Sequence, residues 1–493
     1  MNKFLLCLAV SSLTLLTGTS AQAQAPAAPP AQAAQMSPQN QAADKAYRSG
    51  DFKQVIAITT QTLASNPKDD IAYYLRASAK VEMAIRGQDA KLLREGLTDA
   101  RQSIAALGKP KAEYYLPYLY GMTHLTMIEG VLDHAQTTVN VATKVIEQLA
   151  NPQQEGLAPL TNEQKANLLF QRGLARLQCE DTVDAAIADF EEAVKTFPAH
   201  MGALMAIADA YVMAGETDLA LESFEIILRK YPNESLIYNN RGMFLQQNGE
   251  YEKAIADFTK AVQINPSFAV AYVNRGYSLL ELDRLAAAES DLTKALELEP
   301  NQPPVLQFRA GARLRQGKSQ EAIADYQQAL KLMPQNPLPY ADLGFVYYFM
   351  HEYKSAAAAF AKAAEVGGEE FRFLNPWRYA SLILSGQGQE TVTLFQPVID
   401  KAEEDRDWID FLTLFLMGKV DQGTLLSKIN KEDQFAQSAQ TCEAHYFIGQ
   451  RISNLGKTEE ATEHYRQSLA TQAKQLSAFR GAQYELKQFD NGQ

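Results

Sequence analysis

The amino-acid sequence predicts an all-α protein, built as a solenoid of stacked helix hairpins. Alanine, leucine, glutamine and glutamate dominate its 493 residues, and no β-branched runs alternate with a period of two. The strongest observation is a ladder of prolines, each 34 residues after the last: Pro198, Pro232, Pro266, Pro300 and Pro334, with Gly368 at the next step. A fixed period of this length is typical of architectures in which each repeat contacts only its neighbours.

Three further columns of residues keep the same period. A small residue lies twelve positions before each member of the ladder: Ala186, Ala220, Ala254, Ala288, Ala322 and Ala356. A bulky side chain lies eight positions before: Phe190, Phe224, Phe258, Leu292, Tyr326 and Phe360. The residue five positions before is alanine in every repeat except one, which has Ile227. We therefore expect two helices per repeat, with small residues at their close approach and the bulky side chain filling the space between repeats.

With these columns, residues 165–368 resemble six regular tetratricopeptide repeats. The repeat Ser235–Phe268 has Tyr238 at its fourth position, Gly242 at its eighth, Ala254 at its twentieth and Phe258 at its twenty-fourth. The resemblance implies a right-handed α-solenoid. Each proline is expected to end the second helix of its repeat, because proline cannot donate an amide hydrogen bond and clashes with the preceding turn.

The N-terminal residues 1–23 are predicted to be an export signal peptide. Lys3 provides the positive start, residues 4–16 are mostly apolar, and Ala21-Gln22-Ala23 forms a small-residue cleavage site. An uncleaved membrane anchor is the alternative, although the apolar stretch is short for a membrane span. Residues 24–42 contain alanine, proline and glutamine with almost no charge, which predicts a disordered linker. After signal cleavage we expect no membrane span.

The regions on either side of the regular repeats are also predicted to be helical. Residues 43–164 read as divergent helical hairpins of the same kind, which need neighbouring hairpins to bury their apolar faces. Residues 369–440 form a helical region without the columns, and residues 441–487 a repeat-like hairpin with a capping helix. The stretches Cys442–Gly449 and Phe479–Ala482 resemble the C-terminal part of exported bacterial repeat adaptors of the new-lipoprotein-I type. That resemblance implies an envelope adaptor, although the lipid-attachment cysteine of that type is absent.

The charge and the reactive residues favour a binding protein over an enzyme. A net charge of −12 argues against a nucleic-acid partner, since phosphate neutralisation requires a dense basic face. The six histidines are scattered, without metal-ligand spacing to cysteines or carboxylates. No phosphate loop or nucleophile motif is present. We expect no catalytic activity, no cofactor and no metal, and we expect Cys179 and Cys442 to be free buried thiols.

Two charged columns run through the regular repeats. Arginine occupies one position on four first helices and aspartate one position on the matching second helices: Arg172 with Asp189, Arg241 with Asp257, Arg275 with Asp291, and Arg309 with Asp325. The other two repeats lose both members together, with Ile207 and Ser223 in one and Leu343 and Ala359 in the other. The paired loss favours a bidentate ion pair that joins each hairpin over a site for an acidic ligand. We expect each pair to be partly exposed and to contribute about 0–1 kcal/mol.

The candidate binding site is the concave face that first helices form in proteins of this family. The inward positions implied by the resemblance include the candidate peptide-binding residues Asn239, Asn240, Met243, Asn274, Tyr277, Gln307, Asp342 and Phe345. Asparagine can donate to and accept from a peptide backbone, while methionine and aromatic side chains adapt to apolar partners. Ordinary packing or solvated surface is the alternative for each single residue.

The predicted function is a non-catalytic scaffold or adaptor that binds protein partners in the periplasm or cell envelope through its concave groove. A docking subunit of a polysaccharide or cell-wall export or synthesis machine is the alternative. An enzyme hidden in residues 369–440 is a third possibility, for which the sequence offers no site chemistry. The partner and the oligomeric state do not follow from the sequence.

Overall fold

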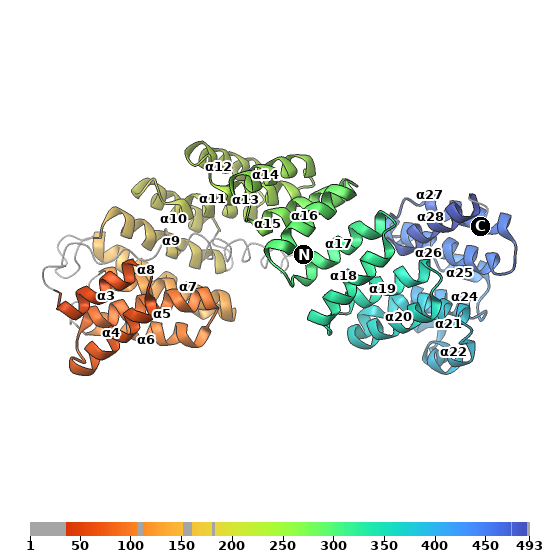
Figure 1. The fold of residues 1–493 in the computed structure, drawn as a ribbon, viewed down its shortest axis with the longest axis horizontal. Coiled ribbons are helices and arrows are strands. Elements are labelled where there is room, and N and C mark those ends of the chain that lie inside the picture. Colours follow the sequence, from red (N-terminus) through yellow and green to blue (C-terminus); the bar gives the residue numbers. More distant parts are fainter. Residues whose placement is uncertain (1–35, 107–111, 151–159, 180–182, 475, 491–493) are drawn as a thin grey trace. The chain divides into compact units, whose positions relative to one another are not determined.

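The computed structural model describes residues 36–106, 112–150, 160–179, 183–474 and 476–490. Within these ranges the chain folds into α- and 3₁₀-helices with no strand, so the all-α repeat solenoid predicted from the sequence is confirmed (Figure 1). Contacts divide the chain into two compact units, residues 1–249 (unit 1) and residues 250–493 (unit 2). Each unit contains its own hydrophobic clusters.

Unit 1 is a series of helix hairpins. Its helices are α3 (Pro38–Arg48), α4 (Phe52–Ser65), α5 (Asp70–Gly87), α6 (Ala90–Ala105), α7 (Tyr115–Glu129), α8 (Leu132–Ala150), α9 (Asn162–Gln178), α10 (Val183–Thr196), α11 (Met201–Ala214), α12 (Thr217–Lys230) and α13 (Ser235–Gln247), with a 3₁₀ turn, η2 (Ala112–Tyr114), before α7. Successive helices pack against each other, and the first helices α3, α5, α7, α9 and α11 also contact one another in sequence. The first helices therefore share one side of the unit.

Helical structure begins inside the region expected to be a disordered linker. Helix α3 starts at Pro38 rather than at residue 43, because the Ser37 side chain caps the backbone amide of Asn40 at 3.1 Å. The side-chain Nδ2 of Asn40 donates to both carboxylate oxygens of Asp69, at 2.9 and 3.1 Å. The expectation of disorder for residues 38–42 is thus corrected by a capped helix tied to α5. Residues 24–35 of the predicted linker and the signal peptide lie outside the described residues.

Unit 2 begins with regular hairpins and ends with shorter, less regular helices. The regular part contains α14 (Tyr251–Ile264), α15 (Ala269–Glu281), α16 (Leu285–Leu298), α17 (Pro303–Arg315), α18 (Ser319–Leu332), α19 (Leu338–Phe349) and α20 (Tyr353–Gly367). The C-terminal part contains η3 (Gly368–Leu374), α21 (Asn375–Leu384), α22 (Gly388–Leu394), α23 (Gln396–Asp400), η4 (Glu403–Asp405), α24 (Trp408–Leu416), α25 (Gln422–Ser427), α26 (Gln434–Ser453), α27 (Thr458–Ala470) and α28 (Ser477–Asp490).

The prolines and the turn residues of the repeat determine where its helices end. The second helix of each regular repeat with a proline ends two residues before that proline; these helices are α10, α12, α14, α16 and α18. The residue between helix and proline leaves the helical conformation, as at Asn265 with φ −127° and ψ 92°. Proline disfavours helical backbone at the residue before it, which explains this stop. The turn between paired helices has a positive φ at Gly215, Gly249 and Gly317. The equivalent positions Asp283 and His351 adopt the same left-handed backbone without being glycine.

The bulky side chain of each repeat lies over the small residue of its own first helix. A Cβ atom built on Gly173 would lie 2.4 Å from the ring of Phe190, and one on Gly344 would lie 2.4 Å from the ring of Phe360. These rings are fully buried. The ring therefore fills the space inside the hairpin, rather than only the space between repeats that the sequence analysis assigned to it.

The arginine and aspartate columns form bidentate ion pairs. Arg275 donates to Asp291 at 2.7 and 2.8 Å, and Arg309 donates to Asp325 at 3.0 and 2.7 Å. Arg172 and Asp189 form the same pair in unit 1. The aspartates are nearly buried, so the expected partial exposure is wrong for the acidic member. The divergent hairpin α5–α6 has an equivalent pair, Arg76 with Asp99, that the sequence analysis missed.

An aromatic cluster joins the C-terminal helices to the last regular repeat. The ring of Trp377 on α21 contacts Phe345 and Tyr348 of α19 at centroid distances of 5.1 and 5.2 Å. It also contacts Tyr446 and Phe447 of α26 at 5.1 and 4.9 Å. Helix α28 packs on α26 and on α19. The C-terminal region is thus built around the end of the regular repeats.

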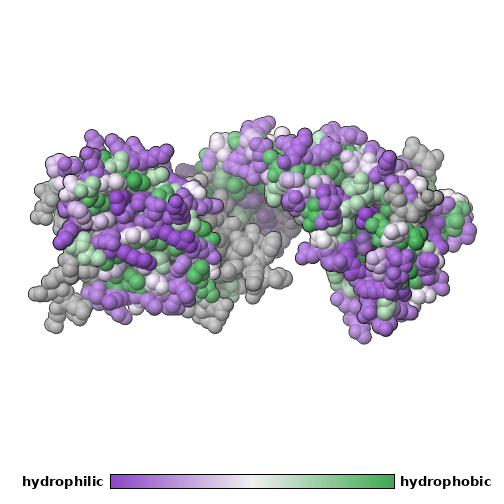
Figure 2. All heavy atoms as spheres, turned by 90° about the horizontal axis from the view of Figure 1, so that it is seen from below, coloured by the Kyte–Doolittle hydropathy of each residue, from purple (hydrophilic) through white to green (hydrophobic). Residues whose placement is uncertain are grey.

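The exposed surface is mainly polar. The face drawn in Figure 2 is largely hydrophilic, with hydrophobic residues in small groups between polar ones. Across the described part of the chain, no helix combines the length and apolar character needed to cross a membrane. Cys442 is a free, buried thiol, whereas Cys179 is only half-buried, so the expectation of two buried thiols is wrong for Cys179.

Candidate functional site

The eight candidate peptide-binding residues lie on the first helices α13, α15, α17 and α19, and they fall into three groups with different surroundings. Asn239, Asn240 and Met243 share α13 of unit 1. In unit 2, one group comes from α15 and α17, and the other from α19. The exposure of each group decides what it can bind.

The α13 group is largely buried. Asn239 is fully buried, and its side-chain amide lies 3.3 Å from Oδ1 of Asn240 and 3.4 Å from Sδ of Met243. The Nδ2 atom of Asn240 is buried without a hydrogen-bond partner among the described residues. A buried donor left unsatisfied costs about 1–3 kcal/mol, so this amide would gain from an acceptor supplied by a ligand.

The α15 and α17 group forms a half-exposed surface on two neighbouring first helices that pack together. We call it the α15–α17 surface; it consists of Asn274, Tyr277, Gln307 and Phe308. The rings of Tyr277 and Phe308 meet edge to face, with centroids 5.4 Å apart. Gln307 makes only a long contact of 3.4 Å with the carbonyl of Pro303 on its own helix. The surface thus combines an aromatic pair with two side-chain amides.

The α19 group is covered by the C-terminal helices. The ring of Phe345 is held between Phe360 and Trp377, at centroid distances of 5.1 Å to each. Burial raises the pKa of Asp342 to about 6, against the opposing effects of the positive charge of Arg480 on α28 and the hydroxyl of Tyr326. In this structure Asp342 and Phe345 therefore serve the closure of the repeat array, and the open part of the predicted groove in unit 2 is the α15–α17 surface.

Sequence reasoning missed a buried polar cluster in unit 1. The carboxylate of Glu82 on α5 is 1% exposed, and both its oxygens lack a hydrogen bond within the described part of the chain. Its nearest cation, Arg86, is 3.9 Å away. Burial raises the pKa of Glu82 to about 7. The hydroxyl of Tyr47 is also unsatisfied, and its pKa is raised by burial and by the charge of Glu82. In the sequence, the only sign of this buried carboxylate is that Glu82 lies between the apolar residues Val81 and Met83.

Metal-binding chemistry is not assembled by the residues that the structure describes. No group of three or more histidine, cysteine, aspartate or glutamate side chains is arranged to hold a metal ion in those ranges. His445 and His464 do meet, with their Nδ1 atoms 2.9 Å apart, on the paired helices α26 and α27. Burial lowers the pKa of both rings, which stack with their centroids 5.2 Å apart.

Comparison with known proteins agrees with the repeat architecture. Family models of the tetratricopeptide repeat match residues 170–235, 235–268, 269–302 and 312–350. Similar solved structures include MamA from Desulfovibrio magneticus RS-1 (22% identity, 33% of this chain and 93% of that chain, TM-score 0.32) and PilF from Pseudomonas aeruginosa (22%, 43% and 96%, TM-score 0.37). YrrB, described as a repeat protein with an unusual peptide-binding site, matches at 17% identity over 40% of this chain and 97% of its own (TM-score 0.33). No curated protein matches the chain.

Proposed function

We propose that this protein is a non-catalytic scaffold, which binds protein partners along the first helices of its tetratricopeptide repeats. Repeats of this type are typically interaction modules, and their extended faces hold peptide or protein segments. The net charge of −12 supports a protein partner over a nucleic acid. The partner segment would lie on the α15–α17 surface.

The observation that carries this proposal is the half-exposed aromatic pair beside two amide side chains on adjacent first helices. Tyr277 and Phe308 offer a large, rigid apolar contact at low entropic cost. The amides of Asn274 and Gln307 can donate to and accept from an extended backbone. On α19 the equivalent face is occupied by the chain's own C-terminal helices. The scaffold therefore has one open stretch and one closed stretch in unit 2.

We also propose that the protein acts outside the cytoplasm, in the periplasm or cell envelope. The support is the sequence of residues 1–23, with its positive start, apolar stretch and small-residue cleavage site. Expression with the native leader in a bacterial host, followed by fractionation and N-terminal sequencing, tests it. We expect a mature protein in the periplasmic or envelope fraction that starts at or shortly after Gln24. Recovery of the intact N-terminus in the cytoplasm would refute export.

Co-purification tests the binding surface. We expect the variant Asn240→Ala/Asn274→Ala/Tyr277→Ala to lose partners that the unmodified protein retains, since removal of central interface side chains typically costs about 2 kcal/mol or more. The control Gln263→Ala/Gln328→Ala changes two exposed side chains on the second helices α14 and α18. Thermal melting confirms that both variants fold. Survival of every partner in the triple variant would refute the proposed surface.

A further inference from the structure

In the hairpins α15–α16 and α17–α18, the arginine of the ion pair binds a third residue, on the second helix of the preceding repeat. Nη1 of Arg275 donates to Oγ1 of Thr259 at 3.1 Å, and Nη1 of Arg309 donates to Oγ1 of Thr293 at 3.2 Å. Both threonines lie 16 residues before their arginine. Each guanidinium therefore occupies a site made of an aspartate and a threonine, between two successive second helices.

In the hairpin α11–α12 all three members of this site are different. The arginine position holds Ile207, the aspartate position Ser223, and the threonine position Glu191. The hydroxyl of Ser223 donates to the carbonyl of Leu219 on its own helix at 2.8 Å, so it does not reach across the gap. The place of the guanidinium is therefore left without a cation from the protein.

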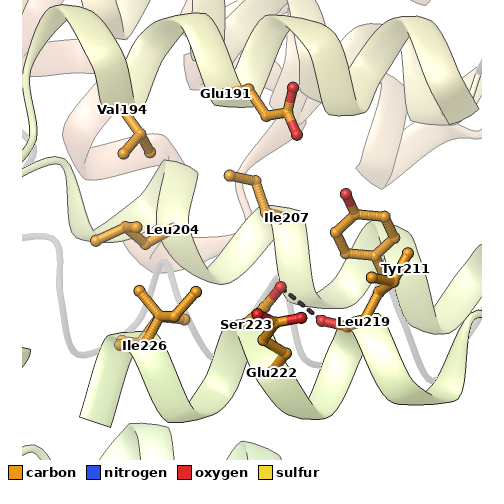
Figure 3. Close-up of a pocket in the computed structure, with 10 residues that line it drawn as sticks. Glu191, Val194, Leu204, Ile207, Tyr211, Leu219, Glu222, Ser223 and Ile226 are labelled. Atoms are coloured by element: carbon orange, nitrogen blue, oxygen red, sulfur yellow. Dashed lines mark hydrogen bonds between the residues drawn. The ribbon is translucent and has the colours of Figure 1, made fainter. Parts of the chain in front are cut away.

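This place is a cavity of about 300 Å³ that lies within unit 1. Figure 3 shows Ile207 and Leu204 of α11 between the residues of α10, among them Glu191, and those of α12, among them Glu222. The volume is at the lower end of the range for ligand pockets, about 300–1,000 Å³, and suits one long side chain. In the other repeat without the ion pair, Leu343 holds the arginine position and is buried in a cluster with Val346.

The cavity has an apolar lining and an acidic rim. Leu219 and Ile226 line its mouth and are 41% and 46% exposed. Glu191 and Glu222 also line it, and neither forms an ion pair or hydrogen bond with another described residue. The negative charges of these carboxylates act on Tyr211, which also lines the cavity. Burial raises the pKa of the Tyr211 hydroxyl, and the charges of Glu191 and Glu222 raise it further.

We propose that this cavity binds an arginine side chain of a partner protein, whose guanidinium takes the place that the protein's own arginine holds in the neighbouring repeats. The aliphatic stem of the arginine would pack on Ile207 and Leu204, and its guanidinium would meet the carboxylates of Glu191 and Glu222. An apolar residue next to the arginine would cover Leu219 and Ile226. This site involves the second helices α10 and α12, so it is independent of the α15–α17 surface.

A pair of peptides tests the proposal on the full-length chain. The probe is a fluorescein-labelled, end-capped peptide Gly-Leu-Arg-Leu-Gly, and its matched control replaces arginine with citrulline, which has nearly the same shape without the charge. Fluorescence polarisation is expected to give a dissociation constant below about 1 mM for the arginine peptide, as befits one anchoring side chain. The citrulline peptide is expected to bind at least about tenfold more weakly.

Variants of the protein locate the binding. Glu191→Gln/Glu222→Gln is expected to weaken the arginine peptide about tenfold. Glu192→Gln/Glu225→Gln removes the same charge from exposed positions of α10 and α12 outside the cavity, and it should bind normally. Ile207→Arg/Ser223→Asp places the protein's own guanidinium in the cavity and should abolish binding. Asn274→Ala/Tyr277→Ala should leave it unchanged, which separates this site from the scaffold surface.

Three results would overturn the proposal: no binding of the arginine peptide at 1 mM, equal binding of both peptides, or undiminished binding by the Glu191→Gln/Glu222→Gln variant. If melting shows that Ile207→Arg/Ser223→Asp does not fold, the two glutamine variants decide the question alone, since they change only exposed carboxylates.

Discussion

Removal of the Asp291 carboxylate is predicted to loosen the hairpin α15–α16 by about 2–3 kcal/mol. An exposed ion pair contributes about 0–1 kcal/mol, whereas breaking a buried one costs about 3–5 kcal/mol. The side chains of Arg275 and Asp291 are 18% and 10% exposed and are joined by two hydrogen bonds of 2.7 and 2.8 Å, which places this pair between those limits. Asp291→Ala would leave the guanidinium of Arg275 half-buried, with only Thr259 as a neutral acceptor.

Native-state hydrogen exchange followed by mass spectrometry measures this loss where it occurs. In a repeat array, stability is a sum of local terms, so amides of α15 and α16 should exchange about 30- to 150-fold faster in Asp291→Ala. Amides of α26 and α27 serve as an internal reference. The double variant Arg275→Met/Asp291→Leu removes both charges and should recover most of the protection. If exchange is unchanged in Asp291→Ala, or if the double variant is as unprotected as the single one, the Arg275–Asp291 ion pair does not stabilise this hairpin as predicted.

Two further predictions concern other parts of the core. Glu82→Gln should stabilise unit 1 at pH 8 but have little effect at pH 4, because folding raises the pKa of this carboxyl from 4.5 to about 7. The cost of burying it therefore grows between about pH 4.5 and 7, as the unfolded carboxyl ionises, and reaches about 3 kcal/mol above pH 7. Urea unfolding of both proteins at the two pH values measures this, and a variant that is no more stable at pH 8 would contradict it. Gly481→Ala should lower the melting temperature, because its new Cβ would lie 2.6 Å from the buried ring of Tyr446, and overpacking of this kind typically costs about 1–3 kcal/mol. Its matched control, Gly311→Ala, meets open space on α17 and should be neutral or slightly stabilising, so an equal effect of the two substitutions would argue against close packing at Gly481.

The regular part of the fold could be predicted from the sequence because its determinants are local and periodic. Each proline stops a helix through the residue before it, and the paired loss of Ile207 with Ser223 already indicated that arginine and aspartate belong together. The third member of that site was missed, because Thr259 becomes recognisable only when the preceding second helix is placed beside Arg275. The burial of the aspartates was likewise underestimated, since it depends on how closely the repeats stack.

The candidate site was less predictable than the fold. The sequence pattern placed Asn274, Tyr277 and Gln307 on first helices, and the structure finds them on the adjacent helices α15 and α17. It could not indicate that Trp377 packs on Phe345 or that α28 packs on α19, because these contacts join residues far apart in the chain without any repeated spacing. Pro376 and Pro397 lie at the starts of α21 and α23, where they divide the predicted helical region 369–440 into short segments. Helix α26 starts at Gln434, earlier than the predicted repeat-like hairpin of residues 441–487.

Site-specific photo-crosslinking shows whether partners bind along the α15–α17 surface. A benzophenone amino acid would replace Tyr277 on α15 or, as the control, the exposed Gln328 on the second helix α18. Irradiation in cells followed by mass spectrometry identifies covalent partners at each position. We predict protein adducts at position 277 that are absent at position 328. Adducts at 328 with none at 277 would contradict the account.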